Sequence, residues 1–249
     1  REDCYLWRIL ATGASFSLFG LGALVLGYLV FPLVTLFARD RQTATRRCRY
    51  LVHLCFRAFV RFMRSTGVLS WSVEGRERLA LPGQLVIANH PSLIDIVFLI
   101  AMLPNASCIV KADLYRNPFT RGPVSRAGYV PNNSPEQLLD DCVRTLAAGT
   151  SLVIFPEGTR SVRGGELRFR RGAAYVWLQA NCPLALATIS SDPPTLGKGE
   201  KWYQIPHRRP HFRLAVKRDI REARKTPEAP SARELTRYWQ HYFRQEIST

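Results

Sequence analysis

Two short motifs in this chain contain the residue types that general-base chemistry needs. In Asn89-His90-Pro91-Ser92-Leu93-Ile94-Asp95, a histidine precedes an aspartate. An imidazole can take a proton near neutral pH, and a carboxylate bonded to its other ring nitrogen fixes the tautomer and stabilises the imidazolium. The second motif, Phe155-Pro156-Glu157-Gly158-Thr159-Arg160-Ser161, offers donors suited to phosphate and a glycine that lets a ligand approach the backbone. A base with its orienting acid and a separate anion-binding loop are the parts that an acyl-transfer site needs.

Each motif also has a plainer interpretation. His90 could be a core histidine bonded to a backbone carbonyl, and the second motif could be a tight turn with solvated charges. Ser92 could act as a nucleophile, although a hydroxyl in this place is more typical of the start of a helix. We therefore expect a substrate hydroxyl to attack directly once His90 has taken its proton.

The flanking sequence predicts strands that end at both motifs. Short β-rich runs alternate with helical runs after Gly67, which predicts an α/β domain. In such domains reactive groups commonly lie beyond the carboxyl ends of the strands. Strands are expected at residues 84–88, 108–111, 151–155, 184–189 and 212–216, and helices at residues 91–102, 134–148, 172–180 and 232–245.

A long uncharged run precedes the predicted domain. No charged residue stands between Ile9 and Ala38, and this run exceeds the roughly 20 residues that span a bilayer. It favours a membrane anchor over residues 1–38, either as one tilted span or as a hairpin that re-enters one leaflet. A signal peptide and a buried core helix are the alternatives, but the run is too long for the apolar region of a signal peptide. The residues that could bend the run are Gly13, Gly20, Gly22, Gly27 and Pro32.

Residues 39–70, which follow this run, are rich in basic residues and are predicted to form an amphipathic helix. Arginines are far more numerous behind the apolar run than the charges in front of it, which predicts that the bulk of the protein is cytoplasmic. Basic residues recur at helical spacing opposite apolar ones, as in a helix that lies in the headgroup layer of an anionic membrane. A surface helix docked on the protein core is the alternative. The basic set is Arg46, Arg49, His53, Arg57, Arg61 and Arg64, and the apolar set is Leu51, Leu54, Cys55, Ala58, Phe59, Phe62 and Met63.

The overall charge requires an anionic partner. The 249 residues include 35 Lys and Arg against 19 Asp and Glu, a net charge of +16. A nucleic-acid-binding protein would explain this charge but not the apolar run, so we expect an anionic membrane surface and no nucleic acid. The six cysteines lack Cys-x2-Cys spacing, and we expect no metal. The nucleic-acid alternative would use the basic tail Arg208, Arg209, Arg213, Lys217, Arg218, Arg221, Arg224 and Lys225.

The two motifs and their order resemble the glycerophospholipid acyltransferase family, typified by bacterial lysophosphatidic acid acyltransferase. Over residues 85–189, Asn89, His90 and Asp95 match the family's first block, Phe155 to Ser161 matches the third, and Gly128 matches the glycine that opens the second. The resemblance implies one acyltransferase domain over residues 71–249, with a mixed sheet flanked by helices.

The resemblance also implies roles for individual residues. His90 would be the general base and Asp95 its orienting acid, without a covalent enzyme intermediate, a metal or another cofactor. The acyl donor would be a thioester of coenzyme A or acyl carrier protein, and the acceptor a lysophospholipid hydroxyl. The expected location is the inner membrane, with the catalytic domain on its cytoplasmic face. The expected substrate-binding residues are Asn89, Lys111, Glu157, Gly158, Thr159 and Arg160.

Two blocks depart from the family pattern. After Gly128 no basic residue occurs before Arg144, where the family has an arginine for the glycerol phosphate, and Lys111, Arg121 and Arg126 are the possible replacements. In the fourth block, Leu186 replaces a proline. The acceptor therefore stays open between a lysophosphatidic-acid-like lipid and another molecule, such as a lyso-aminolipid or a polyene-type product. A catalytically inactive lipid-binding relative is the remaining alternative.

Overall fold

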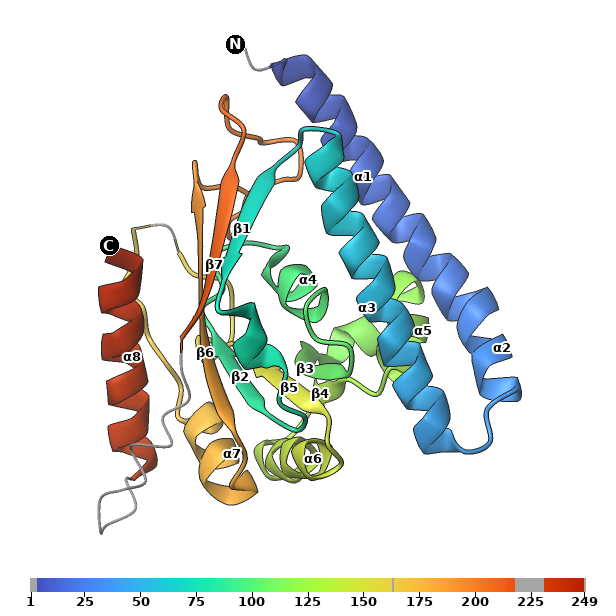
Figure 1. Ribbon diagram of the computed structural model, residues 1–249, viewed down its shortest axis with the longest axis vertical. Coiled ribbons are helices and arrows are strands. Elements are labelled where there is room, and N and C mark those ends of the chain that lie inside the picture. Colours follow the sequence, from blue (N-terminus) through green and yellow to red (C-terminus); the bar gives the residue numbers. More distant parts are fainter. Residues whose placement is uncertain (1–3, 163, 218–230, 249) are drawn as a thin grey trace.

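The computed structural model describes residues 4–162, 164–217 and 231–248, and it is built on one seven-stranded sheet (Figure 1). The strand order is β1-β7-β6-β2-β5-β3-β4. Strands β6, β2, β5, β3 and β4 run parallel, whereas β7 is antiparallel to β6 and parallel to β1. The predicted mixed α/β sheet is thereby confirmed. The strands are Ser70–Glu74 (β1), Leu85–Ala88 (β2), Ala106–Lys111 (β3), Val130–Asn132 (β4), Ser151–Ile154 (β5), Leu184–Asp192 (β6) and His211–Lys217 (β7).

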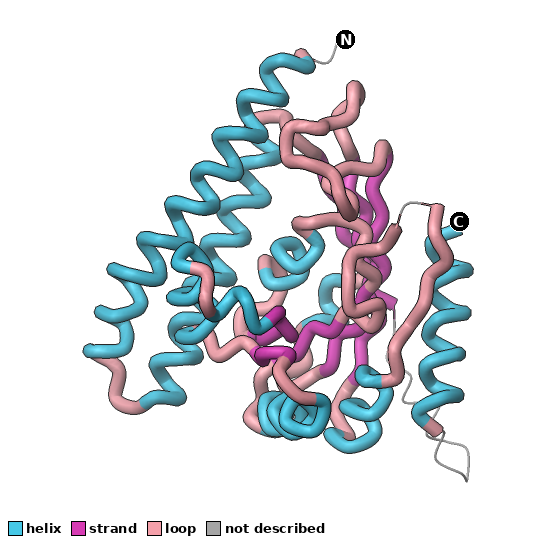
Figure 2. Tube along the Cα trace, turned by 180° about the vertical axis from the view of Figure 1, so that it is seen from behind, coloured by secondary structure: helices cyan, strands magenta, loops and turns pink. Residues whose placement is uncertain are grey.

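Helices cover both faces of this sheet. From behind, α8 lies on one side of the strands, whereas α1, α2 and α3 lie on the other (Figure 2). The α-helices are Tyr5–Val25 (α1), Phe31–Leu36 (α2), Arg41–Ser65 (α3), Asp95–Ile100 (α4), Pro118–Arg126 (α5), Pro135–Ala147 (α6), Gly172–Ala180 (α7) and Ala232–Ser248 (α8). Short helical turns lie at Leu26–Val30 (η1, a π-helix), Arg76–Leu79 (η2) and Ala112–Tyr115 (η3).

The central strands are buried on both faces, as expected for parallel strands between two helical layers. Side chains alternate along β2, so Val86 and Ala88 join the core beneath α3, α4 and α5. Leu85 and Ile87 join the core beneath α6, α7 and α8. This double burial fixes the register of β2, because a slip by one residue would exchange the two sets of side chains. The register fixes where β2 ends, and it therefore fixes the position of the turn that follows β2.

Most of the predicted elements are present, and one helix was placed wrongly. The five predicted strands and the helices at residues 134–148, 172–180 and 232–245 occur within a few residues of their expected bounds. The helix predicted at residues 91–102 instead begins at Asp95, because the Ser92 backbone N–H and hydroxyl both bond to the Asp95 carboxylate and hold a turn there. The sequence patterns did not predict β1, β4 and α5.

The uncharged run forms one continuous helical rod. The segment Tyr5–Leu36 is the one described helix long and apolar enough to cross a membrane, and an 18-residue stretch within it has a mean hydropathy of 2.1. The π-helical turn lies just before Pro32, which lacks an N–H and clashes with the carbonyl four residues earlier in a regular helix. The chain does not fold back inside the run, as a re-entrant hairpin would require. It turns at residues 37–40 and returns as α3 (Figure 1).

Helix α3 is docked on the protein core, and its faces differ from the predicted ones. Because it lies between α1–α2 and the sheet with its covering helices, it is buried on two sides. His53, expected on the basic face, is buried and bonds through Nδ1 to the Ile100 carbonyl at 2.8 Å. Arg49 donates to the Ala127 carbonyl at 2.7 Å. In contrast, Leu54, Cys55 and Ala58, expected on the apolar side, are exposed.

Candidate active site

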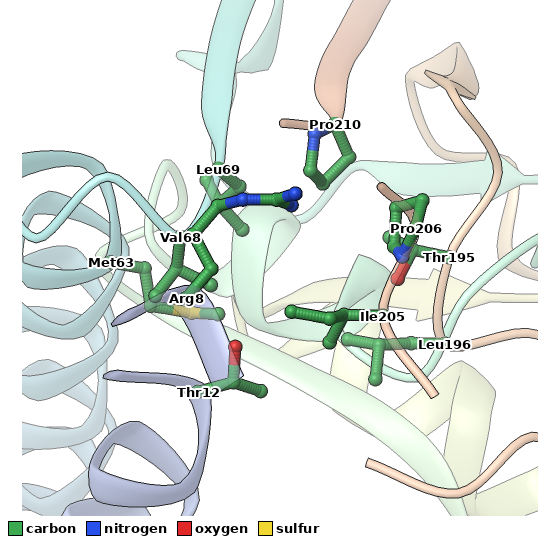
Figure 3. A pocket seen from close by; sticks show the side chains of 10 residues that line it. All are labelled: Arg8, Thr12, Met63, Val68, Leu69, Thr195, Leu196, Ile205, Pro206 and Pro210. Atoms are coloured by element: carbon green, nitrogen blue, oxygen red, sulfur yellow. The ribbon is translucent and has the colours of Figure 1, made fainter. Parts of the chain in front are cut away.

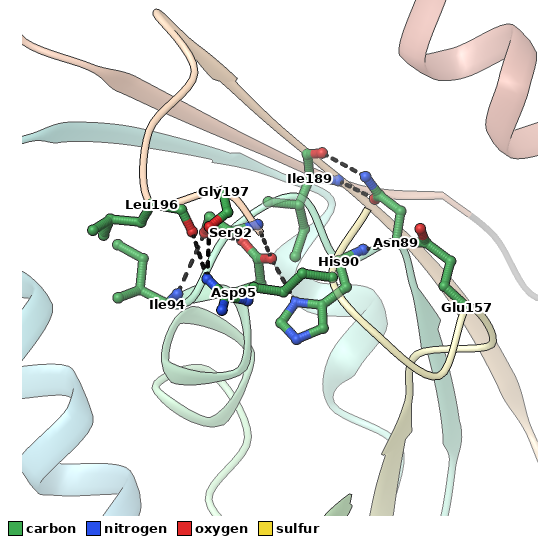
Figure 4. A network of polar contacts seen from close by, with 10 residues as sticks. Asn89, His90, Ser92, Ile94, Asp95, Glu157, Ile189, Leu196 and Gly197 are labelled. Carbon is green, nitrogen blue, oxygen red and sulfur yellow. Dashed lines mark hydrogen bonds and ion pairs between the residues drawn. The ribbon is translucent and has the colours of Figure 1, made fainter. Parts of the chain in front are cut away.

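His90 and Asp95 form a hydrogen-bonded pair just beyond the carboxyl end of β2 (Figure 4). The distance from His90 Nδ1 to Asp95 Oδ2 is 2.8 Å. The Asp95 side chain is fully buried, whereas that of His90 is 19% exposed. The carboxylate is therefore buried, and the imidazole is partly exposed with Nε2 turned away from Asp95. General-base catalysis requires this arrangement, because Nε2 must be able to reach a substrate proton.

Ser92 holds the Asp95 carboxylate in place. Its backbone N–H donates to Asp95 Oδ2 at 2.6 Å, and its hydroxyl donates to Oδ1. Burial raises the pKa of Asp95, and the hydrogen bonds from His90 and Ser92 act in the opposite direction. Ser92 is itself completely buried. Its hydroxyl thus orients the acid and is not placed to attack a substrate.

The second motif is bonded directly to the turn of residues 89–95, which contains His90 and Asp95. The His90 backbone N–H donates to Glu157 Oε1 at 2.9 Å, and the Ser161 N–H donates to the His90 carbonyl at 2.8 Å. Burial raises the pKa of Glu157, opposed by hydrogen bonds from the Ser161 side chain and the His90 backbone. Strands β2 and β5 are adjacent and parallel, so their carboxyl ends deliver both motifs to the same edge of the sheet.

Phe155 was not predicted to take part in the site, yet it forms one wall of it. Its ring is stacked on the His90 imidazole, with centroids 4.1 Å apart and planes inclined by 17°. This contact restricts rotation of the imidazole and places an aromatic face beside the charge that develops on it. Phe155 is the first residue of the second motif, so the motif itself contained the signal.

The other predicted substrate-binding residues differ in their exposure and in their distance from the His90–Asp95 pair. The Asn89 amide bonds to the Ile189 backbone, donating at 2.8 Å and accepting at 2.7 Å, and only 2% of the residue is exposed. It therefore anchors the turn of residues 89–95 to β6. Lys111 is the exposed last residue of β3, at the same edge but two strands from β2, or roughly 10 Å by the usual strand spacing. Thr159 is exposed in the loop that follows β5.

Gly158 and Arg160 are engaged within the protein. Gly158 has φ of +70°, which glycine adopts without strain, and a Cβ there would lie 3.2 Å from Arg170 Nε. Arg170 therefore adds a cation to this loop that the sequence did not single out. Arg160 donates through Nη1 to the carbonyls of Leu196 at 3.2 Å and Gly197 at 2.7 Å. Of the proposed basic replacements, Arg126 donates to the Gly27 carbonyl and Arg121 is exposed.

The described residues contain no cluster of three or more His, Cys, Asp or Glu side chains that could hold a metal ion. Part of the basic tail considered for nucleic-acid binding, Arg218, Arg221, Arg224 and Lys225, lies outside the described residues, as do residues 1–3 of the expected anchor.

These features define an α/β protein with a carboxylate-oriented histidine at the carboxyl edge of its sheet. Comparison with known proteins shows what this domain is similar to. Residues 70–190 match the model of the Acyltransferase family. The matched segment contains His90, Asp95 and the Phe155–Ser161 loop.

Several curated relatives are similar to this domain. A 1-acyl-sn-glycerol-3-phosphate acyltransferase of Helicobacter pylori is 37% identical over 37% of this chain and 42% of its own length. A Saccharomyces cerevisiae enzyme of the same name is 30% identical over 66% of this chain and 55% of its own length. The matches to the first three curated relatives span about two fifths of those proteins (42%, 39% and 39%).

A solved structure shares the whole fold. The crystal structure of the 1-acyl-sn-glycerophosphate (LPA) acyltransferase PlsC from Thermotoga maritima aligns with a TM-score of 0.75 over 99% of this chain and 98% of its own. The two sequences are 18% identical. The likeness therefore includes the long first helix as well as the sheet.

Proposed function

We propose that this protein transfers an acyl chain from a thioester of coenzyme A or acyl carrier protein to the hydroxyl of a lysophosphatidic-acid-like lipid. The observation that carries the proposal is the 2.8 Å bond between His90 and the fully buried Asp95, with the imidazole at the surface. The names of the relatives, 1-acyl-sn-glycerol-3-phosphate acyltransferases, support the same reaction and acceptor.

In this mechanism His90 Nε2 removes the proton of the acceptor hydroxyl as its oxygen attacks the thioester carbonyl. The Asp95 carboxylate stabilises the imidazolium that forms. When the tetrahedral intermediate collapses, the carbon–sulfur bond breaks and the imidazolium returns its proton to the departing thiolate. The products are the ester and the free thiol, and His90 ends neutral.

The cations near the carboxyl edge are the proposed contacts for the acceptor's phosphate. Lys111 and Thr159 are exposed at this edge, and the Arg170 guanidinium lies against Gly158. Within the described residues, the bonds of Arg160 to the Leu196 and Gly197 carbonyls both use Nη1. We keep Glu157 and Gly158 as parts of this loop that shape the site, and we assign Asn89 to positioning the catalytic turn.

An acceptor without a glycerol phosphate is the second candidate. It is favoured by the engagement of Arg160 with two backbone carbonyls, together with the lack of a basic residue between Gly128 and Arg144. Such an acceptor, for example a lyso-aminolipid or a polyene-type product, would need fewer cations at the site but the same His90 chemistry.

A panel of thioesters and acceptors tests both candidates. The vesicle-bound protein is given acyl-coenzyme A or acyl-acyl carrier protein with lysophosphatidic acid or a lyso-aminolipid, and products are identified by mass. Acylation of lysophosphatidic acid by wild type, lost in His90→Ala, is the expected result. Acylation of the lyso-aminolipid alone would support the second candidate, and equal background rates for wild type and His90→Ala would refute acyl transfer.

We further propose that the rod formed by α1 and α2 lies in the plane of an anionic cytoplasmic leaflet and does not cross it. The rod contacts the protein along much of its length: Arg8 bonds to the carbonyls of Arg208 and His207, and Gly27 abuts Gly122. A helix that crossed the bilayer would have to leave this polar, basic domain. The rod nevertheless exposes many large apolar side chains: Leu6, Trp7, Leu10, Leu18, Leu21, Val25, Tyr28, Leu29, Leu33 and Leu36.

Spin labels placed at these exposed positions distinguish the two arrangements. In a variant without the exposed Cys4 and Cys55, labels at Leu6, Leu21 and Leu36 should reach the same shallow depth in vesicles. A label at Leu21 much deeper than the other two would show that the helix spans the membrane.

A further inference from the structure

The loop of residues 193–210, between β6 and β7, contacts both active-site motifs through one backbone carbonyl (Figure 4). The Leu93 N–H, in the turn between His90 and Asp95, donates to the Leu196 carbonyl at 3.0 Å. Arg160 Nη1, from the second motif, donates to the same carbonyl at 3.2 Å. The Leu196 carbonyl therefore ties the two motifs to each other and to this loop.

Leu196 has an unusual conformation for this task. Its φ is +55°, in the left-handed region that non-glycine residues rarely occupy, and only 4% of the residue is exposed. Such a conformation persists only where the surrounding structure imposes it, and it is concentrated at functional sites. At Leu196 it directs the carbonyl toward Leu93 and Arg160.

The same loop is docked on α1 at its other end. Arg8 donates through Nη1 to the Arg208 carbonyl at 3.2 Å, and the Tyr5 and His207 rings are stacked with centroids 5.0 Å apart. Gly13 lies under Trp202, where a Cβ would come within 3.1 Å of the ring. A cavity of about 20 Å³ lies between α1 and the loop, where Arg8 and Thr12 of α1 face Thr195, Leu196, Ile205 and Pro206 of the loop (Figure 3).

We infer that the 193–210 loop is a positioning element that links the docking of α1 to the geometry of the His90–Asp95 pair, with Leu196 as its positioning residue. This inference rests on the proposed acyl transfer for its catalytic readout. Arg160 then contributes to catalysis by fixing the loop to the second motif. Through these contacts a shift of α1, the proposed membrane helix, is transmitted to the turn that contains His90 and Asp95.

Two substitutions at Leu196 separate a backbone role from simple packing. Isoleucine keeps the apolar volume but is β-branched and resists positive φ, whereas asparagine tolerates positive φ but loses apolar burial. We expect Leu196→Ile to lower kcat about tenfold with KM nearly unchanged, and Leu196→Asn to stay within about threefold of wild type. A residue that only packs would give the reverse order. Leu152→Ile, a buried change of the same kind in β5, is the matched control and should leave kcat unchanged.

A second pair of variants tests the link to α1. Gly13→Leu forces a side chain against Trp202, whereas Gly20→Leu makes the same change on the same helix where no atom lies within 4 Å of a Cβ. We expect kcat to fall several-fold for Gly13→Leu alone. Equal kcat for the two variants would refute the coupling.

Hydrogen exchange of the Leu93 amide provides a readout that needs no turnover. This amide should exchange faster in Leu196→Ile and Gly13→Leu than in Leu152→Ile and Gly20→Leu, because its acceptor is displaced. Unchanged exchange at Leu93 would refute the inference even if the enzyme is active. If wild type consumes no thioester but exchange changes as expected, the proposed reaction fails and the positioning link remains.

Discussion

Replacing Asp95 with Asn removes one charge from the active site while keeping the shape of the buried side chain. Asp95 accepts the Ser92 N–H at 2.6 Å and the Ser92 hydroxyl, and it lies 2.8 Å from His90 Nδ1. An Asn side chain can satisfy all three partners if its NH2 group takes the Oδ1 position and the Ser92 hydroxyl rotates to accept. The Asn oxygen then still accepts from His90, so the imidazole tautomer is preserved.

The expected loss for Asp95→Asn is therefore moderate. A hydrogen bond to a charged group contributes about 1 to 2 kcal/mol more than a neutral one, which corresponds to about 5- to 30-fold in kcat. The variant Ser92→Ala alone removes one donor to Asp95, about 1 kcal/mol or roughly fivefold. In the double variant the Asn NH2 loses its acceptor and can turn toward His90, which disfavours the catalytic tautomer. We expect kcat of the double variant to be well below the value obtained by multiplying the two single reductions in kcat.

The assay measures release of free thiol from acyl-coenzyme A at saturating lysophosphatidic acid. The variants compared have circular dichroism spectra that match wild type, and the rate of His90→Ala is subtracted as background. Additive losses in the double variant would refute the role given to the Ser92 hydroxyl. A Ser92→Ala protein as inactive as His90→Ala would refute direct attack by the substrate and point to Ser92 as a nucleophile. Wild-type kcat in Asp95→Asn would refute the orienting role of Asp95.

Three further predictions concern neighbouring contacts. Phe155→Leu removes the ring stacked on His90 at 4.1 Å and should lower kcat about 2- to 10-fold at unchanged KM; unaltered kcat would show that the stacking does not matter. Burial raises the pKa of Glu157 above the ordinary 4.5, so its ionisation opposes folding. The melting temperature of wild type should therefore fall relative to that of Glu157→Gln as the pH rises above 4.5. A difference in melting temperature that does not change with this rise in pH would contradict that sign. Gly27→Leu should lower the free energy of unfolding by about 1 to 3 kcal/mol, since a Cβ there meets Pro123 Cδ at 2.8 Å. Gly22→Leu, where no atom lies within 4 Å of a Cβ, is its control in chemical denaturation, and equal stabilities would mean that α5 does not pack on this helix in solution.

Hydrophobic pattern and turn chemistry were sufficient to predict the central elements. Apolar runs of four to six residues predicted β2, β3, β5 and β6, because each of these strands has apolar cores on both faces. β7 was also predicted, although its buried side chains Phe212, Leu214 and Val216 all lie on one face. The strands β1 and β4 were missed, because they lie at the two edges of the sheet and their burial is incomplete. The start of α4 was misplaced since Ser92 bonds to a side chain of its own turn and does not begin the helix.

The face of α3 could not be read from its own residues. A helix with one buried side shows one apolar stripe, but α3 packs against α1–α2 and against the core, so two sides are buried. Arg49 is drawn inside because the carbonyls of Ala127 and Gly128 and the Thr150 hydroxyl accept its hydrogens. These acceptors are far from Arg49 in the chain and leave no local pattern.

The sequence by itself determined which groups could perform chemistry here: His90 with Asp95 and the Phe155–Ser161 loop. It also contained an apolar run whose composition indicates membrane attachment. Side-chain type and spacing carry that information, because proton transfer and burial depend on them. Only the tertiary structure decided how those groups are held. Ser92 orients Asp95, Asn89 and Arg160 bond to backbone groups of Ile189, Leu196 and Gly197, and the apolar helix lies along the protein. Every residue has a backbone carbonyl, so no sequence pattern reveals which one folding will place beside the active site.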